Sequence, residues 1–299
     1  LHLSLRRQRQ MCIRDSYMIP FVKLQGAGND YIALDGRNQN YDWNQLSVDM
    51  SKPAFGIGSD GIVVVFDSDS ADIRMRIYNP DGSEAEISGN GIRLFTKFVI
   101  DSKIINPEKK ILKIETGDGI KTVYPKLEND KVISSRVEMG IPNFIPSKIP
   151  INVPKLNDDD APKFSVSILD RKLDFTCLSV GNPHAVIIID EKVEEFPLVE
   201  IGTIVEKHEY FPNRINFEVV NIISRNKIRA RIFERGAGET LSSGTGSTAS
   251  ASAARYNGLV DDDVEVILDG GNLNISWDGN DMAMLEGPSE EVFSGIWPH

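Results

Sequence analysis

An internal repeat limits the folds open to this chain more than any other feature of its sequence. Residues 73–91 align with residues 228–246 at a constant offset of 155 without a gap, and eight of the nineteen positions are identical. A second match lies upstream in each copy, where a Gly-Asn pair precedes a β-rich run, at residues 28–35 and 181–190 with an offset of 153. Two matches at nearly the same offset indicate that one fold unit occurs twice.

Each copy combines short strands with one helix. Alternating apolar and basic residues, or continuous β-branched and aromatic runs, predict strands over four segments. These segments are residues 62–66, 73–78, 186–189 and 228–233. Glycines open two helical segments, residues 90–100 and 246–256, and the acidic, proline-rich residues 145–163 predict an exposed connection.

Composition excludes several classes of protein. The chain has 299 residues and a net charge of −11, which argues against nucleic acid or an anionic membrane as the main partner. Its apolar runs are far shorter than the roughly 20 residues that cross a bilayer. The only cysteines are Cys12 and Cys177, so neither a disulfide framework nor a multi-cysteine zinc site is expected. We expect a protein of a reducing compartment, the cytoplasm, without a metal or another cofactor.

The N-terminal segment differs from the rest of the chain. Residues 1–17 hold four arginines and one acid, and they lack the apolar core of a signal peptide. We interpret this segment as a non-native extension and take Met18 as the expected start of the protein. On this interpretation Cys177 is the only native thiol.

Both repeats end in the pattern Ser-Gly-x-Gly followed by a candidate helix. The serines are Ser88 and Ser243. Such glycines let backbone N–H groups approach an anion, and a helix N-terminus adds partial positive charge. Two copies that face each other would present both serines to one ligand. The alternative is that each serine only caps its helix, which is the common role of serine at this position.

Two equivalent groups on opposite faces of one carbon are suited to inversion at a stereocentre. One group removes a proton, and the other delivers a proton to the far face. A thiol titrates in the range that this reaction needs. A serine hydroxyl does not, and it needs an adjacent base.

The sequence resembles the diaminopimelate epimerase family from Phe21 to about Trp297. The resemblance rests on Gly-Ala-Gly-Asn-Asp at residues 26–30, Asn-Pro-Asp-Gly-Ser-Glu at 79–84, Ser-Gly-Asn-Gly at 88–91, Gly-Asn-Pro-His at 181–184, Phe-Pro-Asn-Arg-Ile-Asn at 211–216, Glu-Arg-Gly-Ala-Gly-Glu-Thr at 234–240 and Ser-Gly-Thr-Gly at 243–246. The family interconverts LL- and meso-diaminopimelate in lysine biosynthesis and uses no cofactor.

The resemblance also implies a fold. We expect an α+β protein with two pseudo-symmetric lobes, each a mixed, barrel-like sheet around a central helix, and an active site between the lobes. The implied N-terminal lobe spans residues 18–138 with the return of residues 287–299, and the C-terminal lobe spans residues 139–286. The implied partner is a small diaminopimelate-like amino acid, and a homodimer is compatible with the resemblance.

The family's site residues carry over to positions of this sequence. Residues that hold the amino and carboxylate groups of the substrate match Asn29, Asn79, Asn182, Asn216, Glu234 and Arg235. Residues at the helix starts, which bind the reacting α-carboxylate, match Gly89, Asn90, Gly244 and Thr245. His184 is a further candidate for lining the cleft, with a structural hydrogen bond as the alternative. Taken alone, each asparagine is also a common turn residue.

The two catalytic positions depart from the family's pattern. Ser88 and Ser243 stand where the family carries its catalytic cysteines, and Cys177 matches neither position. Three hypotheses remain open. The protein is an epimerase with impaired chemistry, an isomerase or dehydratase of the same superfamily acting on another amino acid, or a catalytically inactive protein that binds amino acids.

Overall fold

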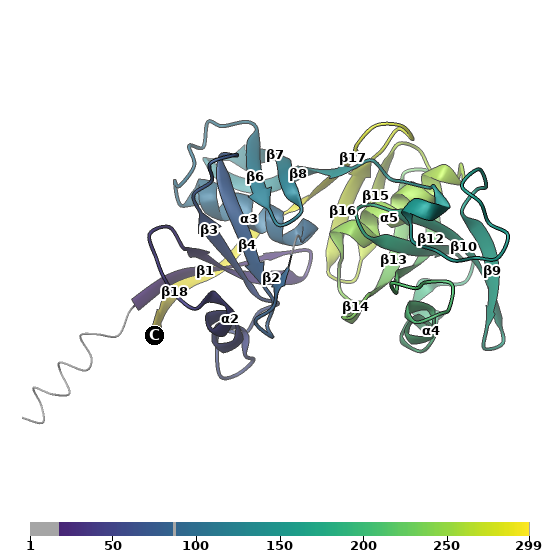
Figure 1. Cartoon of the computed structure of the whole chain (residues 1–299). Helices are drawn as coiled ribbons and strands as arrows, with labels where there is room; N and C mark the ends of the chain where they lie inside the picture. The colour runs from purple at the N-terminus through teal and green to yellow at the C-terminus, as the bar shows by residue number, and fades with distance from the viewer. Residues whose placement is uncertain (1–17, 86–87, 299) are drawn as a thin grey trace, which may run out of the picture.

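The structure, a computed structural model, describes residues 18–85 and 88–298. The extension expected over residues 1–17, with Cys12, lies outside the described residues. Figure 1 shows two lobes side by side, each with a helix against its strands, and two strands that run between them. The α+β fold class with two similar lobes is confirmed.

The first lobe is built from the N-terminal half of the chain. Its elements are β1 (Met18–Gly26), β2 (Asn29–Asp35), α2 (Trp43–Ser51), β3 (Ile62–Phe66), β4 (Ile73–Tyr78), β5 (Glu84–Ala85), α3 (Gly89–Asp101), β6 (Leu112–Thr116), β7 (Gly119–Glu128) and β8 (Lys131–Gly140). The last strand of the chain, β18 (Glu290–Pro298), pairs antiparallel with β1 and so belongs to the same sheet.

The second lobe repeats this order. Its elements are η1 (Pro146–Lys148), β9 (Lys163–Ile168), β10 (Arg171–Ser179), β11 (Pro183–Ile188), η2 (Val193–Glu195), α4 (Leu198–Glu206), β12 (Asn216–Ser224), β13 (Lys227–Glu234), β14 (Gly238–Thr240), α5 (Gly244–Tyr256), β15 (Asp263–Leu268), β16 (Gly271–Ser276) and β17 (Ala283–Pro288). Strand β17 also pairs with β8, and this pairing joins the two lobes.

The strand register confirms the repeat. In the first lobe Ile62 of β3 lies opposite Tyr78 of β4, and in the second Phe217 of β12 lies opposite Phe233 of β13. Adding 155 to both residue numbers of the first pair gives the second pair, and 155 is the offset of the sequence alignment. The parallel pairs β2–β3 and β11–β12 also correspond. The two halves of the chain therefore share one topology, not merely a similar strand pattern.

Each lobe has an inner helix and an outer helix. In the first lobe α3 packs on the face of β2 and β3 that carries Ala33 and Val63, and α2 packs on the opposite face with Ile32 and Ile62. In the second lobe α5 is the inner helix, as α3 is in the first, and α4 is the outer helix, as α2 is. Because both faces of these strands are buried, their sequences are continuous apolar runs.

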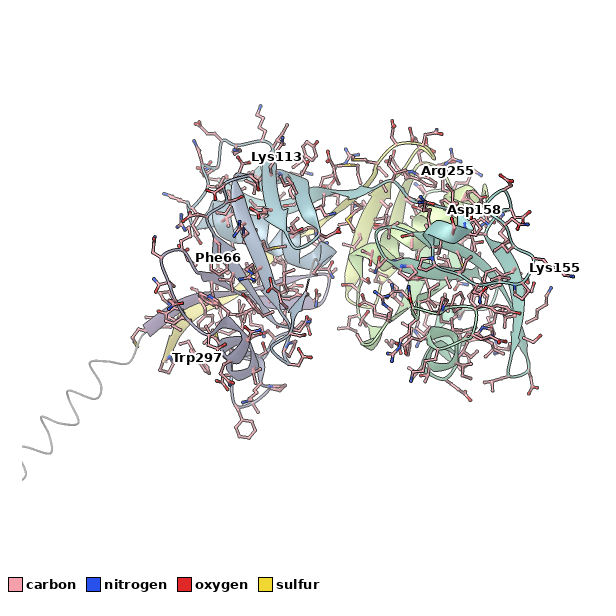
Figure 2. The ribbon with its side chains drawn as sticks, viewed as in Figure 1. Phe66, Lys113, Lys155, Asp158, Arg255 and Trp297 are labelled. Atoms are coloured by element: carbon pink, nitrogen blue, oxygen red, sulfur yellow. The ribbon has the colours of Figure 1, made fainter. Side chains whose placement is uncertain are left out.

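The expected strands and the two inner helices are confirmed to within three residues at their ends, and β3 and β4 match their expected bounds. The outer helices α2 and α4 were not expected. Helix α2 is only nine residues long, and α4 is rich in β-branched residues, which predict a strand. The connection over residues 145–163 is mostly exposed, and Figure 2 shows Lys155 and Asp158 at the outer edge of the second lobe.

Candidate active site

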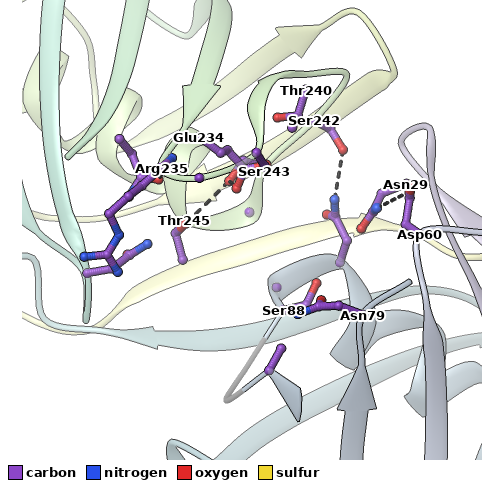
Figure 3. A pocket seen from close by; sticks show the side chains of 18 of the residues that line it. Asn29, Asp60, Asn79, Ser88, Glu234, Arg235, Thr240, Ser242, Ser243 and Thr245 are labelled. Atoms are coloured by element: carbon purple, nitrogen blue, oxygen red, sulfur yellow. Dashed lines mark hydrogen bonds between the residues drawn. The ribbon is translucent and has the colours of Figure 1, made fainter. Parts of the chain in front are cut away.

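A cavity of about 1030 Å³ lies between the lobes. It is lined by the starts of α3 and α5, by the ends of the strands that precede these helices, and by β7 and β8. Figure 3 shows side chains of both lobes converging on this space. The topology explains the convergence, because the repeat places the same strand–loop–helix corner on each side.

The two inner helices meet at their first residues. A Cβ atom on Gly244 would lie 3.0 Å from the Cα atom of Gly89, and one on Gly89 would lie 3.2 Å from the Cα atom of Gly244. Backbones can approach this closely only where no side chain intervenes. The unpaired N–H groups of both helix N-termini are thereby brought to one place. This is a setting for a carboxylate.

Ser88 and Ser243 precede these glycines, and both line the cavity. Each serine caps its helix: the Oγ atom of Ser88 accepts from the N–H of Gly91 at 3.0 Å, and that of Ser243 accepts from Gly246 at 3.3 Å. The capping role considered from the sequence is therefore present. It leaves each hydroxyl proton available to a second partner.

Those second partners differ between the lobes. The Ser243 hydroxyl donates to the carboxylate of Glu234 at 2.9 Å, so it has a base beside it. Ser88 forms a hydrogen bond with Tyr31, a buried residue whose pKa is raised to about 12 by burial. A protonated phenol beside Ser88 and a carboxylate beside Ser243 give the two faces of the cavity different proton chemistry.

Three asparagines line the cavity with part of the amide already paired to protein. Asn29 donates its Nδ2 to Asp60, and Asn79 donates its Nδ2 to Ser83 at 2.9 Å. Their Oδ1 atoms are left to accept from a ligand. In Asn182 the other end of the amide is paired. Its Oδ1 lies 2.8 Å from the Nε2 atom of His184, and its Nδ2 is left to donate to a ligand.

Two other asparagines have both ends of the amide paired. Asn216 donates to the carbonyl of Pro183 and accepts from the N–H of Arg235, each at 2.9 Å. Asn90 donates to Ser242 at 2.9 Å and accepts from Arg93 at 2.9 Å. Both residues line the cavity. These pairings hold the loops around the cavity in place.

Every carried-over residue except His184 lines the cavity, including Glu234, Arg235 and Thr245. His184 is fully buried behind Asn182, and its Nδ1 lies 2.6 Å from Oε1 of Glu218. The expectation that His184 lines the cleft is therefore corrected, because strand β11 directs its ring into the lobe. His184 instead makes the structural hydrogen bond that was its alternative role.

The sequence predicted Glu234 but none of the other acidic residues of the cavity. Acids outnumber bases among its lining residues, six to two: Asp60, Asp81, Asp118, Glu138, Glu234 and Glu239 against Lys121 and Arg235. Burial raises the pKa of Asp60 above its ordinary value. Asp60 lies just before β3, and Glu138 lies near the end of β8, so no local motif marks either residue. The excess of acids favours a ligand that carries ammonium groups.

Within residues 18–85 and 88–298, no group of three or more His, Cys, Asp or Glu residues is placed to hold a metal ion. Cys177 is buried in β10, away from the cavity lining, and burial raises the pKa of its thiol. In the same part of the chain no helix is long and apolar enough to cross a membrane.

Comparison with known structures shows the fold. A PhzF-family phenazine biosynthesis protein from Bacillus anthracis has a TM-score of 0.65 at 16% identity, covering 95% of this chain and 100% of the other. A hydroxyproline epimerase from Agrobacterium vitis, solved with trans-4-hydroxy-L-proline, has a TM-score of 0.64 at 14% identity, covering 94% and 91%.

Comparison with sequences is more specific. Two relatives named diaminopimelate epimerase, from Methanococcus maripaludis strain C6 and Agathobacter rectalis, are 44% and 42% identical to this chain over 277 and 284 residues. Each alignment covers 92% of this chain and 98% of the relative. The family model described as diaminopimelate epimerase matches residues 21–145 and 176–292. The chain belongs to the diaminopimelate epimerase family.

Proposed function

We propose that this protein binds diaminopimelate between its lobes and epimerises one α-carbon without a cofactor, at a rate limited by its two serines. The observation that carries the proposal is the contact between Gly89 and Gly244, which brings the capping serines of both lobes to one cavity. A substrate carboxylate held by both helix N-termini would place its α-carbon between Ser88 and Ser243.

The other polar groups of the cavity suit a diamino diacid. Acceptors for ammonium are the Oδ1 atoms of Asn29 and Asn79 and the carboxylate of Glu234. Donors for the second carboxylate are the guanidinium of Arg235 and the Nδ2 of Asn182. Diaminopimelate carries two of each charged group, and the cavity offers both kinds of partner.

Proton transfer follows from the partners of the serines. Glu234 can take the hydroxyl proton of Ser243 as that oxygen takes the α-proton, and Ser88 can deliver a proton to the opposite face. The reverse reaction runs the same transfers backwards: the Ser88 alkoxide takes the α-proton, and Glu234 returns its proton to Ser243 as the Ser243 hydroxyl protonates the other face. A serine hydroxyl is a much weaker acid than a thiol, so turnover is expected to be slow relative to a cysteine pair.

The setting of this reaction is part of the proposal. We place it in lysine biosynthesis in the cytoplasm, with a small amino acid as the partner and a homodimer as the assembly to test. We further propose lobe boundaries at residues 18–138 with 287–299 and at residues 139–286. The pairing of β18 with β1 supports this division.

Exchange of the α-proton with solvent deuterium tests the proposal. The protein and its Ser88→Cys plus Ser243→Cys variant are incubated with LL- or meso-diaminopimelate in D2O, and loss of the α-proton is followed by NMR. We expect fast exchange in the double cysteine variant and slow exchange in the parent. The single variants are the controls, because inversion needs a group on each face. Absence of both binding and exchange in the parent and the double variant would reject diaminopimelate as the ligand.

A second function is favoured by one observation: both serines are already engaged as helix caps. In that case the protein binds an amino acid and does not turn it over. Calorimetry separates the two functions, because this alternative requires saturable binding of diaminopimelate by the parent with no exchange of its α-proton.

A further inference from the structure

A fully buried acid and histidine lie directly behind the cavity. The side chains of Glu218 and His184 are both 0% exposed, and Oε1 of Glu218 lies 2.6 Å from Nδ1 of His184. Neither residue lines the cavity. Burying such a pair costs desolvation energy, so it is weak evidence for stability. The hydrogen bonds of the Glu218–His184 pair indicate that it has another role.

The pair continues to the cavity through one residue. Nε2 of His184 lies 2.8 Å from Oδ1 of Asn182, and Asn182 lines the cavity. An amide oxygen can only accept a hydrogen bond, so Nε2 carries a proton. The proton shared with Glu218 then lies at Nδ1, on the histidine or on the acid. In either state the imidazole donates to Asn182.

This donation fixes which end of the Asn182 amide faces a ligand. With Oδ1 held by His184, the two N–H groups of Nδ2 remain for the cavity. In the flipped amide the oxygen would face the cavity and would repel a carboxylate. Asn182 also adjoins Pro183, whose carbonyl accepts from Asn216, and Asn216 in turn accepts from the backbone of Arg235. Asn182 and Arg235 therefore belong to one connected corner of donors.

The position of Glu218 is also set by the fold. It lies on β12 beside β11, and a Cβ atom at Gly246 would lie 3.2 Å from its Oε1. Glu218 thus packs against the first turn of α5, where the helix dipole favours a negative charge. Its Oε2 atom has no hydrogen-bond partner among the described residues. The acid is therefore held by His184 and by the helix start, and it is not part of a larger ion-pair network.

We propose that Glu218 and His184 are positioning residues that orient the Asn182 amide and so make this corner of the cavity selective for the second carboxylate of the ligand. The inference rests on the proposed function, because it requires a diacid in the cavity. It differs from a role in proton transfer, since neither residue lines the cavity.

Two ligands separate this role from a purely structural one. Lysine has the carbon chain of diaminopimelate without the second carboxylate. In a His184→Phe plus Glu218→Leu variant the buried pair is replaced by apolar groups of similar volume, a change that is often tolerated. We expect the affinity for diaminopimelate to fall roughly 10- to 100-fold, as for loss of a hydrogen bond to a charged group, while the affinity for lysine is unchanged.

Two further variants serve as controls. Glu218→Gln is expected to retain the preference for diaminopimelate, because the glutamine amide can donate to Nδ1 and leave the proton on Nε2. Cys177→Ala changes a buried side chain that lies within range of the charge of Glu218 but has no part in the hydrogen-bond chain, and it is expected to leave the ratio of the two affinities unchanged. The proposal would be overturned if the double variant lost affinity for both ligands equally, or if it kept its full affinity for diaminopimelate.

A second measurement does not depend on the variant folding. The chain has four histidines, so the ¹⁵N signals of His184 can be assigned in the parent by substituting the other three. We expect Nε2 of His184 to be protonated. An unprotonated Nε2 would mean that Asn182 donates to it and turns its oxygen to the cavity, and the inference would be wrong. If the parent binds neither ligand, the proposed function fails as well, whatever the histidine signal.

Discussion

Tyr31 is a buried phenol beside Ser88, and its pKa reflects that burial. Its side chain is buried, and burial raises its pKa to about 12, against an ordinary value of 10.0. Asp60 and Glu234 add to this effect, because their negative charges disfavour a phenolate. The phenol therefore stays protonated over the whole range in which an amino-acid epimerase would work.

The shifted pKa of Tyr31 predicts a loss of stability at alkaline pH. Between pH 10 and about 12 the unfolded chain loses the Tyr31 proton while the folded chain keeps it, so folding becomes less favourable as pH rises. The expected loss is about 1.4 kcal/mol per pH unit over that interval. Urea unfolding at several alkaline pH values, compared with Tyr31→Phe, measures this slope. A parent and variant with the same slope would contradict the buried environment.

At the scale of elements, the contact between the first residues of α3 and α5 leaves little room for a side chain. Gly244→Ala would place a Cβ atom 3.0 Å from a backbone atom of Gly89, which cannot move away as a side chain can. We expect the variant to lose roughly 1–3 kcal/mol of stability through overpacking, although alanine is the better helix former. Ligand affinity should fall with it, and both are measured by thermal unfolding with and without diaminopimelate.

The same contact supplies the control for this prediction. Gly89→Ala should lower the stability in the same way, because its Cβ atom would meet the backbone of Gly244. The double variant should lose less stability than the two single variants added together, because both changes act on one contact. A Gly244→Ala protein that is more stable than the parent and binds equally well would show that the helix starts can separate at no cost.

The two hairpins that lead into the inner helices are held by equivalent ion pairs. Arg76 binds Glu84 at 2.8 Å and Arg231 binds Glu239 at 2.6 Å, and both pairs are related by the offset of 155. Two of the eight identities in the repeat alignment, Arg76/Arg231 and Glu84/Glu239, are therefore explained by this contact. The pairs differ in burial, since the Arg76 side chain is 45% exposed and that of Arg231 is 16% exposed.

This difference predicts unequal effects of the same substitution. Glu84→Gln should cost no more than about 1 kcal/mol, as exposed pairs do. Glu239→Gln should cost more, because it leaves the less exposed Arg231 without its acid. Urea unfolding compares the two variants, with the exposed Glu108→Gln as the control for loss of a surface charge. Equal losses would show that burial of Arg231 adds nothing to the pair.

At the scale of the molecule, the repeat predicted two copies of one fold unit with their serines facing each other, and the family resemblance implied the fold of each lobe. The repeat could not reveal residues whose place depends on long-range register. Lys121 and Glu138 reach the cavity only because β7 and β8 lie beside the start of α3, and neither has a local motif. His184 was misplaced for a related reason, since the side of β11 on which a residue lies depends on the pairing of β11 with β12.

The largest apolar cluster runs through both lobes without a break. It contains Leu94 and Phe95 of α3 together with Ala249 of α5, Val186 of β11 and Leu285 of β17. Two smaller clusters lie under the outer helices and share strands with it, as β2 does by turning Ala33 inward and Ile32 outward. Because a continuous core must be broken as a whole, we expect the lobes to unfold together.

Tryptophan fluorescence tests this cooperativity in urea. The chain has three tryptophans, and two of them, Trp43 at the start of α2 and Trp277 after β16, are buried in different lobes. Trp277→Phe plus Trp297→Phe leaves the probe in the first lobe, and Trp43→Phe plus Trp297→Phe leaves it in the second. Each variant's fluorescence midpoint is compared with the midpoint of its own far-ultraviolet circular dichroism, which corrects for the substitutions. Coincident midpoints in both variants are expected. A fluorescence transition that precedes the circular dichroism in one variant and follows it in the other would show lobes that unfold separately, with the shared core too weak to couple them.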